Sequence, residues 1–293
     1  MVKPAPSNSA SQAAGFVLTV SCPDRVGIVA AVATFLAERG GDIEASDQFG
    51  DRSSGRFFLR IAFQMPGWTA DAVRSEFAPL ATKFQMDWAL FDRALRPRLL
   101  ILVSRGGHCL ADLLYRYGAG LLGGEVAAVG SNHRDFYRLA ASYDVPFHHL
   151  PVTPETRLIQ ERKVLELVES EAIDLVVLAR YMQILSDPIC RALTGRCINI
   201  HHSFLPSFRG AKPYHQAHAH GVKLIGATAH YVTADLDEGP IIEQDVVRVT
   251  HAMSPEALAA AGRDVECRVL ARAVTAHIDH RVLLNGPRTI VFP

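Results

Sequence analysis

Residues 197–242 read CINIHHSFLPSFRGAKPYHQAHAHGVKLIGATAHYVTADLDEGPII, and this stretch predicts the fold and the site of the second half of the chain. Its first apolar run ends in Asn199, His201 and His202, and a second apolar run leads into the acidic loop 233–238. In parallel α/β sheets, ligands bind beyond the carboxyl ends of the strands. We therefore expect a ligand site where the strand that carries Asn199 and His201 ends.

Other apolar runs precede this stretch, with helical stretches between them. Strands that alternate with helices predict a parallel sheet with helices on both faces, and near-continuous apolar strands fit burial on both sides. We expect a Rossmann-like domain with a mostly parallel sheet over 98–293, which ends with a long helix over 254–280 and a short tail. The expected strands are 98–104, 124–133, 174–181 and 197–203, and a further helix is expected over 161–172.

The residues before this domain follow a different pattern, which predicts a separate domain over 16–92. Its strand and helix signals occur in the order βαββαβ, the ferredoxin-like arrangement. Asp24 is expected to cap the first helix, and Gly40 with Gly41 to end it. The side chains expected to be buried are Val26, Val29, Ala33 and Leu36 in the first helix and Val73, Phe77, Leu80 and Phe84 in the second.

Residues 56–63, RFFLRIAF, predict a strand of the small domain with alternating faces. Two helices can cover only one face of its sheet, so this strand would leave surface free for a second copy of the chain. We therefore expect a homo-oligomer, a dimer or a tetramer. The alternation places Phe57, Leu59, Ile61 and Phe63 on one face, and Arg60 and Gln64 on the other.

Thirty basic and thirty acidic residues balance in the 293-residue chain. A neutral balance provides no field that would hold nucleic acid or an anionic membrane, so neither partner is expected. No apolar run approaches the roughly 20 residues that span a bilayer. Residues 1–15 are rich in Ser, Ala and Pro, lack the apolar core of a signal peptide and are expected to be disordered. Five cysteines without a CxxC pair indicate reduced thiols in a cytoplasm.

Asn199 and His201 are two residues apart, so in a strand their side chains face the same side. An amide and an imidazole aimed at one point can polarise a carbonyl and stabilise the charge that develops on its oxygen. Asp237 could hold an imidazolium or take a proton from water. The alternative is structural, with Asn199 capping a turn and His201 in the core. Without a Ser or Cys nucleophile, the set suits attack by an external nucleophile on a bound acyl group.

The segments INIHHSFLPSF, GATAHYVTADLDEGPII and LARYMQILS resemble the folate-dependent formyltransferase family, and the match extends over 98–293. The resemblance implies that Asn199, His201 and Asp237 are catalytic, and it leaves open whether His201 or Asp237 is the base. It also implies a pterin pocket that needs no cofactor or metal. The residues implied in binding are Tyr181, Met182, Gln183, Ile184, Leu185, Thr228, His230, Thr233 and Asp235.

Two features indicate which acceptor receives the formyl group. The segment after the first strand of the domain reads SRGGHCLADLL, which lacks the phosphate loop that transferases to glycinamide ribonucleotide need. The chain also has no module beyond Pro293 of the kind that methionyl-tRNA enzymes carry. The resemblance therefore implies that water is the acceptor and that formate and tetrahydrofolate are released, which would supply formate for purine biosynthesis and balance the one-carbon folate pools. A transferase to an amine, or a non-catalytic folate or amino-acid sensor, is the alternative.

The segment DRVGIVAAVATFLAERGGDI resembles an ACT domain. That resemblance implies an amino-acid effector bound at Asp24, Arg25 and Gly27, although a turn that needs a cap and a glycine explains these residues equally well. A metal site at His215, His218 and His220, together with His201 and His202, is a further alternative, but the HxxH spacing lacks the acidic or cysteine ligand of a zinc site.

Overall fold

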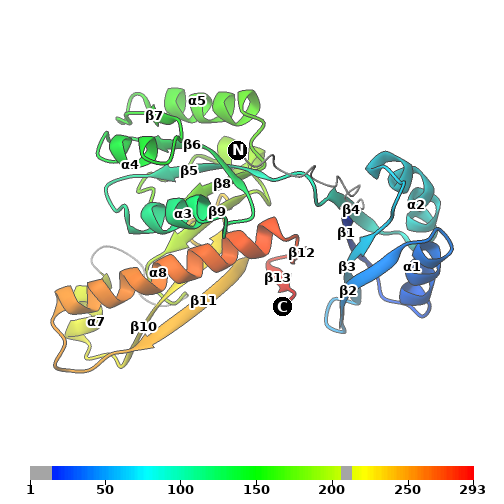
Figure 1. Ribbon diagram of the computed structural model, residues 1–293. Helices are drawn as coiled ribbons and strands as arrows, with labels where there is room; N and C mark the ends of the chain where they lie inside the picture. Colours follow the sequence, from blue (N-terminus) through cyan, green and yellow to red (C-terminus); the bar gives the residue numbers. More distant parts are fainter. Residues whose placement is uncertain (1–14, 206–212) are drawn as a thin grey trace, which may run out of the picture. The chain divides into compact units, whose positions relative to one another are not determined.

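Figure 1 shows the computed structural model of the chain, which describes residues 15–205 and 213–293. Disorder was expected for residues 1–15. Of these, 1–14 lie outside the described residues, and Gly15 is the first residue of a strand. The chain divides into a small unit that extends to Leu95 and includes Phe292, and a large unit over Arg96–Val291 with Pro293. Each unit is described separately.

The small unit is an antiparallel sheet with two helices, in the order β2-β3-β1-β4. This is the predicted βαββαβ arrangement. Its helices pack on one sheet face, where the predicted Phe57, Leu59, Ile61 and Phe63 join the core. The elements are β1 (Gly15–Pro23), α1 (Ile28–Ala37), β2 (Asp42–Asp51), β3 (Arg56–Gln64), α2 (Ala70–Phe84) and β4 (Asp87–Asp92).

The first helix begins later than predicted, and it buries a different face. Its N-cap is Gly27, with no side-chain hydrogen bond, so Asp24 does not cap it. The expected Val26 and Val29 are exposed, whereas Ile28 and Val32 are buried. The prediction was wrong here because α1 reads IVAAVATFLA, which is apolar on every side, so periodicity does not select one face. Its end, with Gly40 at φ 74°, is as predicted.

In the second helix, the predicted Val73, Phe77 and Phe84 are buried, while Ala81 replaces Leu80 on the buried face. Thr69 caps this helix by accepting from the backbone N–H of Ala72. The predicted buried face agrees closely with the observed one because α2, unlike α1, has polar residues between its apolar ones.

The strand β3 is interior to its sheet, which corrects the expectation that it offers a free surface. Phe58 and Ala62, on the face opposite the helices, are also buried. The exposed edge is β2 instead, where Ile43 and Phe49 keep more than a third of their surface in contact with solvent. Any pairing through a sheet edge would therefore use β2 or β4, because β3 already has a neighbour on each side.

The large unit contains a seven-stranded sheet in the order β11-β10-β9-β8-β5-β6-β7. The five strands from β9 to β7 are parallel, and β10 and β11 are antiparallel additions, so the prediction of a mostly parallel sheet is confirmed. The strands are β5 (Arg98–Val103), β6 (Glu125–Ser131), β7 (Phe147–His149), β8 (Leu175–Leu178), β9 (Cys197–His201), β10 (Leu224–Tyr231) and β11 (Ile241–Arg248), followed by the hairpin β12 (Val282–Asn285) and β13 (Arg288–Val291).

Helices cover both faces of this sheet (Figure 1). On one face, α3 and α8 bury apolar side chains such as Leu110 and Val269, and on the other α5 and α6 bury Val164 and Ile189. The long last helix is as predicted. The helices are α3 (His108–Gly118), α4 (Tyr137–Ala141), α5 (Arg157–Ser170), α6 (Asp187–Ala192), α7 (Pro213–Ala219) and α8 (Pro255–Ile278).

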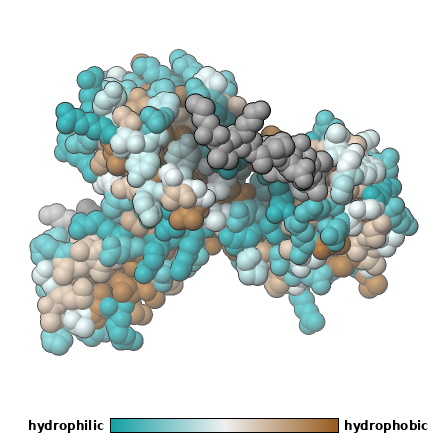
Figure 2. Space-filling model, in the orientation of Figure 1, coloured by the Kyte–Doolittle hydropathy of each residue, from teal (hydrophilic) through white to brown (hydrophobic). Residues whose placement is uncertain are grey.

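The face drawn in Figure 2 is hydrophilic over much of its area, and apolar residues gather at the lower left, where Figure 1 draws α7 and the start of α8. None of the helices in the described ranges is long and apolar enough to cross a bilayer. The apolar side chains of the long helix α8 are instead used in the core, where eleven of its residues are buried.

Phe77→Ala should destabilise the small unit by about 3–5 kcal/mol, because it removes a fully buried ring that packs edge-on against Phe35 and Trp88. Val26→Ala is the matched control, since Val26 is fully exposed and its loss should change the free energy of unfolding by less than about 0.5 kcal/mol. Denaturant unfolding followed by Trp fluorescence measures both. Equal effects from the two variants would contradict the assignment of the buried helix faces.

Candidate active site

The site is built on the pairing of β9 with β10, which places His230 opposite Asn199. The Asn199 amide Nδ2 lies 3.3 Å from Nε2 of His230. Asp237, in the loop after β10, contacts both histidines: its Oδ2 is 3.2 Å from Nδ1 of His201, and its Oδ1 is 3.6 Å from Nε2 of His230. The structure thus brings the three sequence-predicted catalytic residues together around His230.

Hydrogen bonds fix the chemical state of these groups. Nδ1 of His230 donates to the carbonyl oxygen of Tyr231 at 2.9 Å, so the other ring nitrogen of a neutral His230 is an acceptor. That nitrogen can accept from one N–H of the Asn199 amide, and the second N–H has no partner among the described residues. The hydrogen bond from Nδ1 of His201 is the largest effect that holds the pKa of Asp237 well below its usual range, against the effect of burial. Asp237 is therefore a carboxylate at any neutral pH.

His201 differs from the other groups because one of its nitrogens is unpaired. Its Nδ1 faces the Asp237 carboxylate, which can only accept. Its Nε2 is buried and has no hydrogen-bond partner within the part of the chain that the structure describes. A buried polar atom without a partner costs about 1–3 kcal/mol, so such an atom calls for a chemical explanation.

The loop that carries Asp237 is held in an unusual conformation. Asp237 has φ 56°, in the left-handed region that few residues other than glycine adopt. The chain then returns so closely to β10 that a Cβ on Gly239 would overlap the carbonyl oxygen of Tyr231. Thr233 donates to the carbonyl oxygen of Asp235 at 3.0 Å, which closes the start of the loop. The loop geometry thus aims the Asp237 carboxylate back at the strand pair.

A cavity of about 250 Å³ opens beside these groups. Asn199, His201 and Asp237 line it, together with all of the residues implied in pterin binding except Thr228. Met182, Ile184 and Leu236 line the cavity although each is more than half exposed. Exposed apolar side chains on a concave surface suit a flat, largely apolar ligand that would cover them.

The pocket segment 181–185 is fixed at both of its ends. At the first end, the hydroxyl of Ser104 accepts from the backbone N–H of Met182 at 2.9 Å and donates to Oδ1 of Asn132 at 2.8 Å. At the second end, the Glu161 carboxylate accepts from the backbone N–H of Ser186 at 2.8 Å and from its hydroxyl. The segment is therefore preorganised by contacts from β5, β6 and α5.

Thr228 occupies a different place from the one the sequence implied. It is completely buried, and its hydroxyl donates to the carbonyl oxygen of Ser203 at 2.9 Å while accepting from the backbone N–H of Leu205 and from Gln244. It does not line the cavity. Thr228 instead holds the segment that follows His202 against β10 and β11, so its contribution to the site is indirect.

Two cavity residues with charged or polar side chains were not among the predicted site residues: His202 and Arg180. The strand β9 ends at His201, and the bend that follows lets the ring of His202 stack on that of His201 with centroids 4.9 Å apart. Nη1 of Arg180 lies 2.7 Å from Nδ1 of His202. The doubled histidine in IHHS and the Arg of LARYM were the signals in the sequence.

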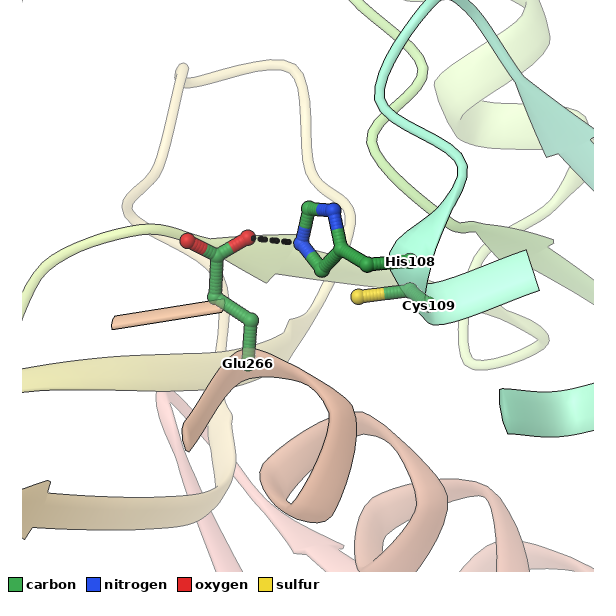
Figure 3. A group of neighbouring side chains, drawn as sticks. All are labelled: His108, Cys109 and Glu266. Carbon is green, nitrogen blue, oxygen red and sulfur yellow. Dashed lines mark hydrogen bonds and ion pairs between the residues drawn. The ribbon is translucent and has the colours of Figure 1, made fainter. Parts of the chain in front are cut away.

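Arg180 also forms an ion pair with a buried carboxylate, that of Glu266 in α8. Its Nε is 3.4 Å from Oε2 of Glu266, which also contacts Nε2 of His108 at 2.7 Å. The hydroxyl of Tyr214 donates to Oε1 at 2.7 Å. Figure 3 shows the His108 ring and the Glu266 carboxylate pointing toward one another from α3 and α8. Burial would raise the pKa of Glu266, but His108, Arg180 and Tyr214 together hold it below its ordinary value.

His108, Cys109 and Glu266 also form the one group of described residues whose atoms come within range of a common metal ion (Figure 3). The geometry favours a hydrogen bond instead. Two ligands at about 2.0–2.1 Å from a tetrahedral metal lie more than 3 Å apart, whereas His108 and Glu266 are 2.7 Å apart, and Arg180 brings a competing positive charge. Cys109 is a poor ligand, since a contact with Cys267 and burial raise its pKa. His215, His218 and His220 are exposed and outside this group.

In the small unit, the residues implied in effector binding are all exposed but face different neighbours. A Cβ on Gly50 would lie 3.1 Å from the Asp24 carboxylate, so Asp24 borders β2. Arg25 donates to the carbonyl oxygen of Lys83 and stacks over the ring of Phe84, at the end of α2. Gly27, with φ 94°, begins α1. The turn therefore presents exposed backbone between β2 and α2.

The fold and the site define a class of protein. The family model described as formyl transferase matches residues 97–274, and the one described as ACT domain matches 16–65. The chain therefore belongs to the formyl transferase family, with an ACT domain before its catalytic fold.

Within that family, relatives that match nearly the whole chain include formyltetrahydrofolate deformylases. The deformylase of Corynebacterium sp. (strain P-1) is 52% identical over 94% of this chain and 97% of its own. The solved structure of the deformylase from Burkholderia mallei is 54% identical, with a TM-score of 0.92 over 96% of this chain and 100% of that one. By contrast, glycinamide ribonucleotide transformylase 1 from Symbiobacterium toebii is 32% identical, with a TM-score of 0.64, over only 70% of this chain.

Proposed function

We propose that the chain hydrolyses 10-formyltetrahydrofolate to formate and tetrahydrofolate. The observation that carries this proposal is the His201 imidazole, held by the Asp237 carboxylate through Nδ1 and left with an unpaired, buried Nε2 beside a cavity. The similarity to deformylases over both units supports the same reaction. No metal or cofactor is required in this proposal, because the protein groups provide a base, an acid and an oxyanion donor.

The folate would bind with its pterin ring in the cavity of about 250 Å³. The ring would cover the exposed side chains of Met182, Ile184 and Leu236, and the backbone of the segments 181–185 and 233–237 would provide donors and acceptors for its edge. Burial of apolar surface stabilises binding by about 25 cal/mol per Å² before ordering costs are counted. The rest of the folate would place the formyl group near Asn199.

In the proposed reaction, water is the nucleophile and His201 is the base. Nε2 of His201 takes a proton from water as the water oxygen attacks the formyl carbon, and the Asp237 carboxylate stabilises the imidazolium that forms. The free N–H of the Asn199 amide stabilises the oxyanion. When the carbon–N10 bond breaks, Nε2 returns the proton to N10, which gives tetrahydrofolate and formate. Asp237 is the weaker candidate for the base, because its lowered pKa makes it a poor proton acceptor.

The surroundings of the loop after β5 support water over an amine carrying a phosphate. The ring of Phe136 lies where a Cβ on Gly107, the N-cap of α3, would point, so it narrows the space beside this helix N-terminus in which a phosphate could bind. In a cell, the released formate would be available for purine biosynthesis, and the reaction would balance the one-carbon folate pools. We place it in the cytoplasm, where the five free cysteines would stay reduced.

The purified protein, mixed with 10-formyltetrahydrofolate and no amine, should release formate and tetrahydrofolate in equal amounts. Formate is measured with formate dehydrogenase, and tetrahydrofolate by its absorbance. Turnover should be the same after dialysis against a chelator, because no step needs a metal. Turnover that appears only when glycinamide ribonucleotide is added would contradict the proposal, and turnover restored to chelated enzyme by zinc would contradict the metal-free mechanism.

Asp237→Asn keeps the shape of the side chain but removes the charge that holds the His201 imidazolium. The turnover number should fall about 10²–10⁴-fold with folate binding largely kept, and His201→Ala should behave similarly. Asn199→Ala should cost about 10²–10³-fold, the usual effect of losing one oxyanion donor. Steady-state kinetics together with folate titration separates the two effects. An Asp237→Asn enzyme with nearly normal turnover would remove Asp237 from the mechanism.

We infer that the small unit makes the enzyme a homo-oligomer, a dimer or a tetramer, and that it binds a small amino acid such as glycine or methionine. The exposed edge strand β2 could pair with a second copy. The exposed turn at Asp24, Arg25 and Gly27 could meet the amino and carboxylate groups of the effector.

Glycine or methionine should change the rate of hydrolysis by about 5–150-fold, which is the usual range of allosteric coupling. Asp24→Ala should abolish the response and keep the basal rate, and Val26→Ala, on the same turn, should keep both. Light scattering measures the assembly. A chain that is monomeric at micromolar concentration contradicts the pairing, and an Asp24→Ala enzyme that still responds contradicts the effector site.

A further inference from the structure

We propose that His202 selects water as the nucleophile by donating a hydrogen bond from its Nε2–H to the attacking water, and that Arg180 is the positioning residue that keeps this proton on Nε2. The proposal rests on the proposed hydrolysis and names the group that specifies its acceptor. In this proposal Nε2 of His202 is a hydrogen-bond donor, whereas Nε2 of His201 is an acceptor.

The contact between Arg180 and His202 fixes the tautomer of the imidazole. A guanidinium can only donate, so Nδ1 of His202, 2.7 Å from Nη1 of Arg180, must be the acceptor. The proton of a neutral His202 is therefore on Nε2. Burial, followed by the Arg180 and His201 charges, lowers the pKa of His202 to about 4, which keeps the ring neutral near pH 7.

The groups that face His202 come from five parts of the fold. Arg180 follows β8, His201 ends β9, Asp237 lies in the loop after β10 and Glu266 lies on α8. Tyr214 of α7 adds its ring, with centroids 6.4 Å apart. Across the described residues, the contact with Arg180 is the one hydrogen bond that the His202 side chain makes. Nε2 is thus an unused donor on a side chain that lines the cavity.

Arg180 is in turn held by the buried carboxylate of Glu266. Glu266 is 1% exposed, and its Oε2 lies 3.4 Å from the guanidinium. His108 contacts the same oxygen, and the hydroxyl of Tyr214 donates to the other. The helix α8 admits the Tyr214 ring only because residue 262 is glycine, since a Cβ there would overlap the phenol. Arg180 also has φ 63°, a strained conformation that sets the direction of its side chain. The orientation of the guanidinium is therefore determined from several sides.

A donor at this position discriminates between nucleophiles by their lone pairs. The oxygen of water has two, so it can accept from Nε2–H of His202 with one and attack the formyl carbon with the other, while it gives a proton to Nε2 of His201. A neutral amine has a single lone pair. If that pair accepts from His202, it is not available for attack, so the same hydrogen bond that holds water inhibits an amine.

The test measures which nucleophile receives the formyl group. Wild-type and variant enzymes are given 10-formyltetrahydrofolate with methoxyamine, an amine that is mostly unprotonated at neutral pH, and formate and the formylated amine are both quantified. His202→Phe keeps an aromatic ring but loses the donor. Its hydrolysis should fall about 10–10²-fold, and its ratio of amine to water transfer should rise at least about tenfold. His202→Gln, whose amide can donate near the position of Nε2, should keep the wild-type ratio.

The exposed His215→Ala is the matched control and should change neither product. Folate binding and circular dichroism of each variant establish that it is folded. A His202→Phe enzyme in which the two products fall together, or neither changes, overturns the proposal. A wild-type enzyme that releases no formate is a different result, since it overturns the proposed hydrolysis itself.

The part assigned to Arg180 has a spectroscopic readout. In the ¹⁵N spectrum of histidine-labelled protein, His202, assigned by its absence in His202→Gln, should have a protonated Nε2 and an unprotonated Nδ1. Arg180→Met should populate the other tautomer and raise amine transfer, whereas Arg180→Lys, which can still donate, should behave more like the wild type. An unchanged tautomer in Arg180→Met overturns the assignment of Arg180 as the positioning residue.

Discussion

The antiparallel pairing of β9 with β10 is the constraint on which the site depends. In this register His230 lies opposite Asn199 and Thr228 lies opposite His201. A shift of one residue would turn every one of these side chains to the other face of the sheet. The first pair forms the polar contact at the cavity, and the second ties the segment after His202 to the sheet through the Thr228 hydroxyl. One strand pairing therefore places both the proposed catalytic side chains and the segment that carries His202.

Two carboxylates then give two adjacent histidines opposite properties. Asp237 contacts Nδ1 of His201 directly, so that Nε2 of His201 is left as an acceptor. Glu266 holds Arg180, and Arg180 donates to Nδ1 of His202. Nδ1 of His202 is therefore an acceptor, and its Nε2 is left as a donor. Stacked rings of the same residue type can thus receive a proton and hold a water oxygen. Neither property follows from histidine itself, because each is determined by the group on Nδ1.

The sequence predicted the parallel sheet well, because strands buried on both faces are nearly continuous apolar runs that few other structures explain. It failed for α1, where small apolar residues on every side carry no information about direction, and for β3, whose Phe58 is buried on the face that alternation assigned to polar residues. At the site, the motifs predicted which strand ends and loops meet. They could not predict that Arg180 contacts Glu266, because these residues are distant in the sequence and only the packing of α8 against the sheet brings them together.

Backbone strain occurs at the two charged residues that contact His201 and His202. Asp237 and Arg180 are charged residues in the left-handed region, and each faces one of the two histidines. Such a conformation costs about 1–3 kcal/mol and persists only where the surroundings determine it from several sides. Around Asp237 that support comes from the close return of Gly239 to β10, and around Arg180 from the backbone N–H of Ser104, which donates to its carbonyl oxygen at 3.2 Å. Because the backbone conformation and not only flexible torsions aims these two side chains, the fold itself determines where the two charges lie.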